Sequence, residues 1–73
     1  MSLSRIQKEE LLKYEHALET SRIGYARIST SDFAKVLEIY YGSDWKYKTP
    51  RSVLTCGTCK LNELQKIAKE YYA

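Results

Sequence analysis

Apolar side chains in this chain recur at intervals of three and four residues in three separate segments, and no segment alternates apolar and polar residues over the length of a strand. Intervals of three and four place side chains on one face of an α-helix, whereas alternation is typical of a β-strand. The sequence therefore predicts an all-α protein. Its 73 residues suffice for one domain with a small core, so we expect residues 1–73 to form a single three-helix domain.

The first helix is expected from about residue 4 to residue 20 or beyond. Ser4 precedes Gln7 by three residues, which is the spacing of a capping box that satisfies backbone N–H groups at a helix start. The apolar stripe of this helix consists of Leu11, Tyr14 and Leu18. Thr20 opens a run of weak helix formers, so the sequence leaves the end of this helix undefined.

The second helix has both of its ends marked in the sequence and is expected over residues 30–41. Ser29 is a favourable N-cap, and Asp32 at the third helical position is favourable near the positive end of the helix dipole. Gly42 can adopt the positive φ with which many helices end. The buried face is expected to consist of Phe33, Val36, Leu37 and Tyr40.

The third helix is expected over residues 50–72. Proline is favoured at the first helical position, so Pro50 marks a start for which Thr49 is the cap. The residues that follow at intervals of three and four are Leu54, Gly57, Leu61, Leu64, Ala68 and Tyr71. They predict a seam that packs against another helix. In the alternative arrangement, the apolar faces of the three helices close only when the chain forms an oligomer.

Cys56 and Cys59 form a C-x-x-C pair, the one spacing in this chain that is associated with site chemistry. Because His16 is the only histidine, a four-ligand zinc site is better supplied by two chains that contribute one pair each. Redox activity favours a first sulfur at a helix N-terminus, which a helix from residue 50 does not provide. In such a helix both cysteines point away from the leucine seam, on the side of Ile67, and we expect them to face a partner chain or a second layer.

Residues 45–51 interleave aromatic and basic side chains, a composition with three interpretations. Trp45 can cover the small core, the aromatic residues can form a protein contact, or the segment can stack on bases and bind phosphates. The candidate nucleic-acid contacts are Lys46, Lys48, Arg51 and Lys60. Twelve Lys and Arg residues against nine Asp and Glu give a net charge of +3, which is modest for a nucleic-acid-binding protein.

The chain contains seven tyrosines, more than a three-helix monomer of this size is expected to bury. Tyrosine and tryptophan side chains tolerate one wet end and are enriched in protein interfaces, so their clusters at helix ends favour association. The residues expected to form a contact surface are Trp45, Tyr47, Tyr40, Tyr41, Tyr71 and Tyr72.

These patterns predict a small helical protein–protein interaction or assembly module that self-associates or docks on a larger complex. One alternative is a small nucleic-acid-binding protein that uses residues 45–51, and another is a dimer linked by a metal or a disulfide through the C-x-x-C pair. We expect no enzymatic activity, because the sequence contains neither a glycine-rich phosphate loop nor a catalytic Ser-His-Asp or Cys-His arrangement. Apart from zinc at the cysteines, we expect no cofactor.

The sequence also restricts where the protein is expected to act. No uncharged apolar run approaches the roughly 20 residues that span a bilayer, so we expect no membrane partner. Residues 1–10 lack the apolar stretch of a signal peptide, and we therefore expect a cytoplasmic or virion-associated protein that is not secreted. A virus or mobile element is as suitable a source for such a chain as a host cell.

Overall fold

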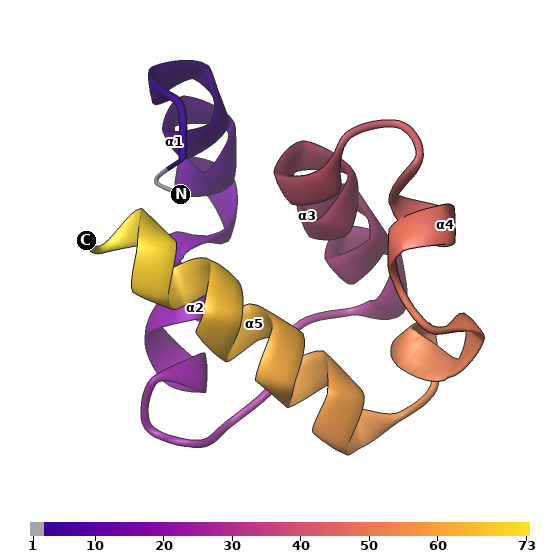
Figure 1. Ribbon diagram of the computed structural model, residues 1–73. Coiled ribbons are helices and arrows are strands. Elements are labelled where there is room, and N and C mark those ends of the chain that lie inside the picture. The colour runs from indigo at the N-terminus through magenta and orange to yellow at the C-terminus, as the bar shows by residue number, and fades with distance from the viewer. Residues whose placement is uncertain (1–2) are drawn as a thin grey trace.

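The structure is a computed structural model that describes residues 3–73, apart from the side chain of Arg51. This part of the chain contains helices and no strand, so the all-α prediction is confirmed. In chain order the elements are α1 (Arg5–Leu11), the 3₁₀ turn η1 (Leu12–Tyr14), α2 (Glu15–Ser21), α3 (Thr30–Tyr41), α4 (Trp45–Lys48), the 3₁₀ turn η2 (Arg51–Leu54) and α5 (Gly57–Tyr71) (Figure 1). Over these residues, none of the helices has the length and apolar character needed to cross a membrane.

The first expected helix is confirmed in its extent, because α1, η1 and α2 follow one another without a gap from Arg5 to Ser21. Its predicted capping box is present. The Gln7 N–H donates to Ser4 Oγ at 3.2 Å, and the Ser4 N–H donates to Gln7 Oε1 at 2.8 Å. The tighter turn η1, which the sequence did not predict, separates the two α-helical halves, and Leu11 and Leu18 on either side of it are fully buried.

The second expected helix is confirmed at both ends as α3. The side chain of Ser29 accepts the N–H of Asp32 at 3.2 Å, and Gly42 ends the helix with a φ of +97°. Phe33, Val36 and Leu37 are fully buried, as their spacing predicted.

The expected third helix over residues 50–72 is wrong at its start. Pro50 has the φ of −63° that proline always favours, but its ψ of 151° is extended rather than helical. The chain then makes the single turn η2, becomes extended again at Cys56, and begins α5 only at Gly57. This detour buries Val53 and Trp45, which are 1% and 7% exposed, in the core. Burial of these two side chains is the physical reason for the break.

The break changes which residues of α5 face the core. Leu64, Ile67 and Ala68 are fully buried, whereas Leu61 is half-buried and Gly57 is exposed. The predicted seam is therefore wrong in its first half. Ile67, which was expected to lie on the back of the helix with the cysteines, is instead a core residue.

Two hydrogen bonds join α2 and α5 at both ends of their contact. Gln65 Nε2 donates to the Ser21 carbonyl oxygen at 2.9 Å, and Tyr71 OH donates to a Glu15 carboxylate oxygen at 2.9 Å. The start of α2 thus meets the end of α5, so the two helices are antiparallel. In Figure 1, α5 runs across one side of the molecule, with α1 and α3 on one side of it; α4 lies beside α3, and the turn η2 lies between α4 and the first turn of α5.

The core joins all of these elements and is made of apolar side chains. It consists of Leu3, Leu11, Leu18, Phe33, Val36, Leu37, Trp45, Val53, Leu64, Ile67 and Ala68. No buried side-chain polar atom among the described residues lacks a hydrogen-bond partner. The monomer therefore closes its own core, as a single domain of this length is expected to do.

Candidate functional site

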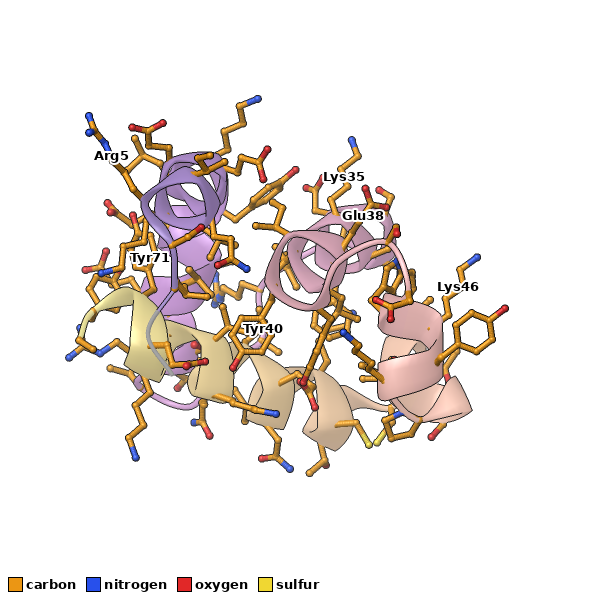
Figure 2. All side chains as sticks on the ribbon, turned by 45° about the horizontal axis from the view of Figure 1, so that its top comes forward. Arg5, Lys35, Glu38, Tyr40, Lys46 and Tyr71 are labelled. Carbon is orange, nitrogen blue, oxygen red and sulfur yellow. The ribbon has the colours of Figure 1, made fainter. Side chains whose placement is uncertain are left out.

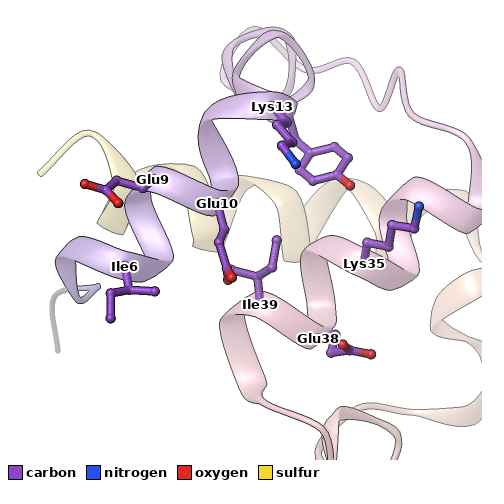
Figure 3. A pocket seen from close by; sticks show the side chains of 8 residues that line it. Ile6, Glu9, Glu10, Lys13, Lys35, Glu38 and Ile39 are labelled. Carbon is purple, nitrogen blue, oxygen red and sulfur yellow. The ribbon is translucent and has the colours of Figure 1, made fainter.

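An open groove with a volume of about 660 Å³ lies between α1 and α3 (Figure 3). Its apolar residues are Ile6, Tyr14 and Ile39, and its charged residues are Glu9, Glu10, Lys13, Lys35 and Glu38. We refer to this set of eight residues as the α1–α3 groove. Shallow, partly apolar depressions with a charged border are typical of protein-binding surfaces rather than of catalytic clefts.

Gln7 fixes the two walls of the groove relative to each other. While its Oε1 accepts the Ser4 N–H, its Nε2 donates to the carbonyl oxygens of Ile39 and Tyr40 at 3.0 and 3.3 Å. These carbonyls lie in the last turn of α3, where no helical N–H is available to them. One side chain therefore caps the start of α1 and the end of α3 at the same time, and the groove does not depend on flexible loops.

The apolar part of the groove is accessible to a partner. Ile6 is 69% exposed, and Ile39 and Tyr14 are half-buried against the core. At about 100° per residue, Ile6 and Ile39 point roughly 110° to 140° away from the apolar stripes of their own helices. Ile6 thus lies outside the core of the chain, whereas Ile39 packs against the edge of the core.

The charges of the groove are unevenly distributed along its length. Figure 3 shows Glu9 beside Ile6 at one end, with Lys13, Lys35 and the acidic Glu38 toward the other end. Glu9 forms an exposed ion pair with Arg5 at 3.4 Å. Among the described residues, no ion pair engages Lys13, Lys35 or Glu10. These three charges are available to a partner.

The tyrosines that were expected to form a contact surface lie in separate places. Tyr40 and Tyr41 end α3 and pack edge to face with ring centroids 4.7 Å apart, whereas Tyr71 and Tyr72 end α5. Figure 2 shows Tyr40 and Tyr71 directed between helices rather than away from the protein. Tyr47 is 92% exposed. The structure thus brings them together only as two neighbouring pairs.

The phenol groups of three tyrosines connect helices to one another. Tyr40 OH donates to Glu70, Tyr41 OH donates to Glu63 at 2.6 Å, and Tyr71 OH donates to Glu15. Burial, followed by the hydrogen bond to Glu15, raises the pKa of Tyr71 to about 12. Burial and then the carboxylate partners also raise the pKa of Tyr40 and Tyr41. These tyrosines hold protons firmly and stabilise the monomer.

A second cavity of about 590 Å³ lies beside these tyrosines, but its polar groups already have partners. Lys66 Nζ donates to Tyr41 OH at 3.1 Å and lies over the Tyr40 and Tyr41 rings, and the hydrogen bond to Tyr41 raises the lysine pKa. Lys48 Nζ donates to the Tyr41 carbonyl oxygen at 3.1 Å. The cluster therefore satisfies itself within one chain.

The expected basic aromatic segment is divided between the core and the surface. Trp45 covers the core, and the exposed Lys46 lies 5.8 Å from its ring centroid (Figure 2). Lys48 is engaged by Asp44 at 3.4 Å, and Lys60 lies 5.6 Å from the Phe33 ring centroid. The side chain of Arg51 is outside the described residues. Since Trp45 is buried, Tyr47 is the aromatic of residues 45–51 that remains open for stacking.

Cys56 and Cys59 lie in the first turn of α5 and are both free and half-buried. They were expected on the outer flank of a continuous helix, but Cys56 is the N-cap residue and Cys59 packs partly against the core. The Cys59 N–H donates to Cys56 Sγ at 3.2 Å. Within residues 3–73, no group of three or more His, Cys, Asp or Glu side chains is arranged to hold a metal ion.

The sequence-based reasoning missed the groove residues Ile6, Lys13, Lys35 and Ile39, although their apolar members carry a signal. An apolar side chain that points away from the apolar stripe of its helix marks a second contact face. Comparisons of this chain with protein-family models, with curated proteins and with solved structures give no match.

Proposed function

We propose that the chain is a small interaction module that forms a symmetric dimer through the α1–α3 groove. The observation that carries this proposal is that the exposed Ile6 lies beside Glu9 at one end of the groove, while Lys13 and Lys35 lie toward its other end. The occupant of the groove is a second copy of the same groove. Two-fold symmetric dimers are the commonest assemblies of soluble proteins, and in them the same surface meets itself.

Charge complementarity supports a second copy as the occupant. When the groove pairs with itself in an antiparallel sense, Glu9 and Glu10 of one chain approach Lys13 and Lys35 of the other chain. The same set of attractions occurs twice because of the symmetry. A parallel pairing places like charges together and is disfavoured. The groove therefore specifies both its partner and the orientation of that partner.

Burial of the apolar residues of the groove contributes a favourable free energy that the charged residues alone do not provide. Ile6 projects into solvent in the monomer, and burial of a complete isoleucine side chain contributes about 1.5 to 3 kcal/mol. Because Gln7 already holds the two walls, little conformational entropy is lost when the partner binds. Ile6 and Ile39 thus contribute the apolar burial of the interface, and the charged residues contribute to its specificity.

Sedimentation velocity over a range of protein concentrations tests the proposal. We expect the wild-type chain to pass from monomer to dimer as concentration rises, and Ile6→Asp to remain monomeric. Ile23→Asp is the matched control, because Ile23 is 73% exposed and lies outside the groove. It should dimerise as the wild type does. Loss of the dimer in both variants, or a wild type that is monomeric at every concentration, would refute self-association.

Charge reversal tests the predicted orientation. Lys35→Glu and Glu10→Lys should each weaken the dimer about tenfold, since each places two like-charged pairs in the interface and an exposed pair contributes up to about 1 kcal/mol. An equimolar mixture of the two variants should regain affinity, because every reversed charge then meets an opposite one. If mixing restores nothing, the antiparallel arrangement is wrong.

A further inference from the structure

The start of α5 brings two thiols together in a way that the interaction module does not use. Cys56 occupies the N-cap position with an extended backbone, and Cys59 lies three residues later in the same turn. The Cys59 N–H donates to Cys56 Sγ at 3.2 Å, so the Cys56 sulfur lies over the first turn of the helix beside the backbone of Cys59. Residues three apart on a helix are neighbours, and disulfides accept Cα separations of about 4.4 to 6.8 Å.

We infer that Cys56 and Cys59 form a thiol–disulfide exchange site that is oxidised by a low-molecular-weight disulfide such as glutathione disulfide. Cys56 is the attacking thiol and Cys59 is the resolving thiol. The product is an intramolecular Cys56–Cys59 disulfide within the first turn of α5.

The environment of Cys56 favours its thiolate. A sulfur at the N-cap of a 15-residue helix faces the free N–H groups and the positive end of the helix dipole. The pKa of the Cys56 thiol is lowered, first by the hydrogen bond from the Cys59 thiol and then by the Cys59 backbone N–H. The same thiol contact and burial raise the pKa of Cys59. The two sulfurs are therefore unequal, as an attacking and a resolving thiol must be.

The surroundings of the pair leave a path for a small disulfide. Thr55, Gly57 and Thr58 are all exposed, and a Cβ atom added at Gly57 would have no other atom within 4 Å. Cys59 packs partly against the core, whereas Cys56 is the N-cap residue at the end of the helix. An incoming disulfide thus meets Cys56 first.

The exchange balances in two steps. The Cys56 thiolate attacks one sulfur of the disulfide RS–SR, forms a Cys56–SR bond and releases one thiolate, which takes up a proton. The Cys59 thiol then loses its proton and attacks the Cys56 sulfur, which breaks the sulfur–sulfur bond of the mixed disulfide and releases RS⁻, and this thiolate takes up the proton to give the second RSH. The protein dithiol is oxidised to a disulfide, and RS–SR is reduced to two RSH.

Mass spectrometry after exposure of the reduced protein to glutathione disulfide tests this site. We expect the wild type to lose two hydrogen atoms and to retain no glutathione. Cys59→Ser should accumulate one glutathione on Cys56, removable by dithiothreitol, because the resolving thiol is gone while a hydroxyl donor remains. Cys56→Ser retains a favourable N-cap and should react more slowly, by about threefold for each unit that separates the two thiol pKa values.

Three results would overturn the inference. They are a wild type that keeps both thiols free, equal reaction rates for the two serine variants, and a disulfide that forms only between chains. Circular dichroism checks that both variants are folded, and Cys59→Ala serves as a second resolving-thiol variant. Ile6→Asp should exchange at the wild-type rate, since the pair lies outside the α1–α3 groove. Failure of dimerisation and failure of exchange are thereby distinguished.

Discussion

Replacement of Leu64 by alanine measures the register in which α5 packs. Leu64 is 0% exposed and belongs to the core cluster, while Leu61, one turn earlier, is only half-buried. The expected seam over residues 50–72 treated the two leucines as equivalent. The observed start of α5 at Gly57 makes them unequal, so Leu61→Ala is the matched control.

The magnitudes follow from burial. Leu→Ala removes about three carbons, which at about 0.8 kcal/mol each gives about 2.4 kcal/mol of lost transfer free energy. At Leu64 the cavity that remains brings the total to about 2.7 to 5 kcal/mol. Leu61 is partly exposed to water and its removal leaves no closed cavity, so the loss should be smaller, about 1 to 2 kcal/mol. A chain of 73 residues has about 4 to 11 kcal/mol in all.

Urea unfolding followed by far-ultraviolet circular dichroism provides both free energies of unfolding. Leu64→Ala should remove about a quarter or more of the stability, or leave the chain unfolded, while Leu61→Ala should remain well folded. The m-values should be unchanged in both. If Leu61→Ala costs as much as Leu64→Ala, the two leucines share one buried seam, and the continuous helix from residue 50 is the better description.

Two further predictions concern the backbone and the tyrosines. Gly42→Ala should cost about 1 to 2 kcal/mol because φ at this position is +97°. Gly57→Ala should be neutral or stabilising by up to about 1 kcal/mol, because Gly57 is helical and a Cβ there faces open space. Thermal unfolding compares the two variants, and equal shifts of their melting temperatures would contradict the helix ends described above. The contribution of the tyrosine phenols to stability should be constant below about pH 10, where the phenols of the unfolded chain are protonated, and fall between about pH 10 and 12. In that interval the unfolded chain loses protons that Tyr71, with its pKa raised to about 12, and Tyr40 retain in the fold. Urea midpoints that do not decrease over this range would show that these phenols are not held by their carboxylates.

Helix ends that depend on neighbouring residues were predictable from the sequence. Ser29, Asp32 and Gly42 define α3 because a side-chain cap and a positive φ are local properties. The Ser4 and Gln7 capping box is local in the same way. The contact of Gln7 with the last turn of α3 is not, since it joins residues more than 30 positions apart. Because the α1–α3 groove depends on this contact, it could not be predicted from the pattern of each helix taken separately.

The tyrosines also show that contacts between distant residues limit what the sequence alone predicts about function. Their number suggested a surface for association, because apolar rings in excess of the core require another partner. Tyr40, Tyr41 and Tyr71 instead find carboxylates on other helices of the same chain. Hydrogen bonds across the fold allow a small domain to accommodate more tyrosines than its apolar core alone can cover. Composition therefore overstates the exposed aromatic surface.

The observed start of α5 explains both why the predicted start of the third helix was wrong and why Cys56 lies at a helix N-terminus. Pro50 is compatible with a helix and with extended backbone, and cysteine is a weak cap signal, so local preference did not separate residue 50 from residue 57. Burial of Val53 beside Trp45 decides between them. That choice moves Cys56 from the flank of a helix to its N-cap, where a sulfur becomes more acidic. A tertiary contact thus decides that Cys56 lies at the helix start, beside the Cys59 N–H that lowers its pKa.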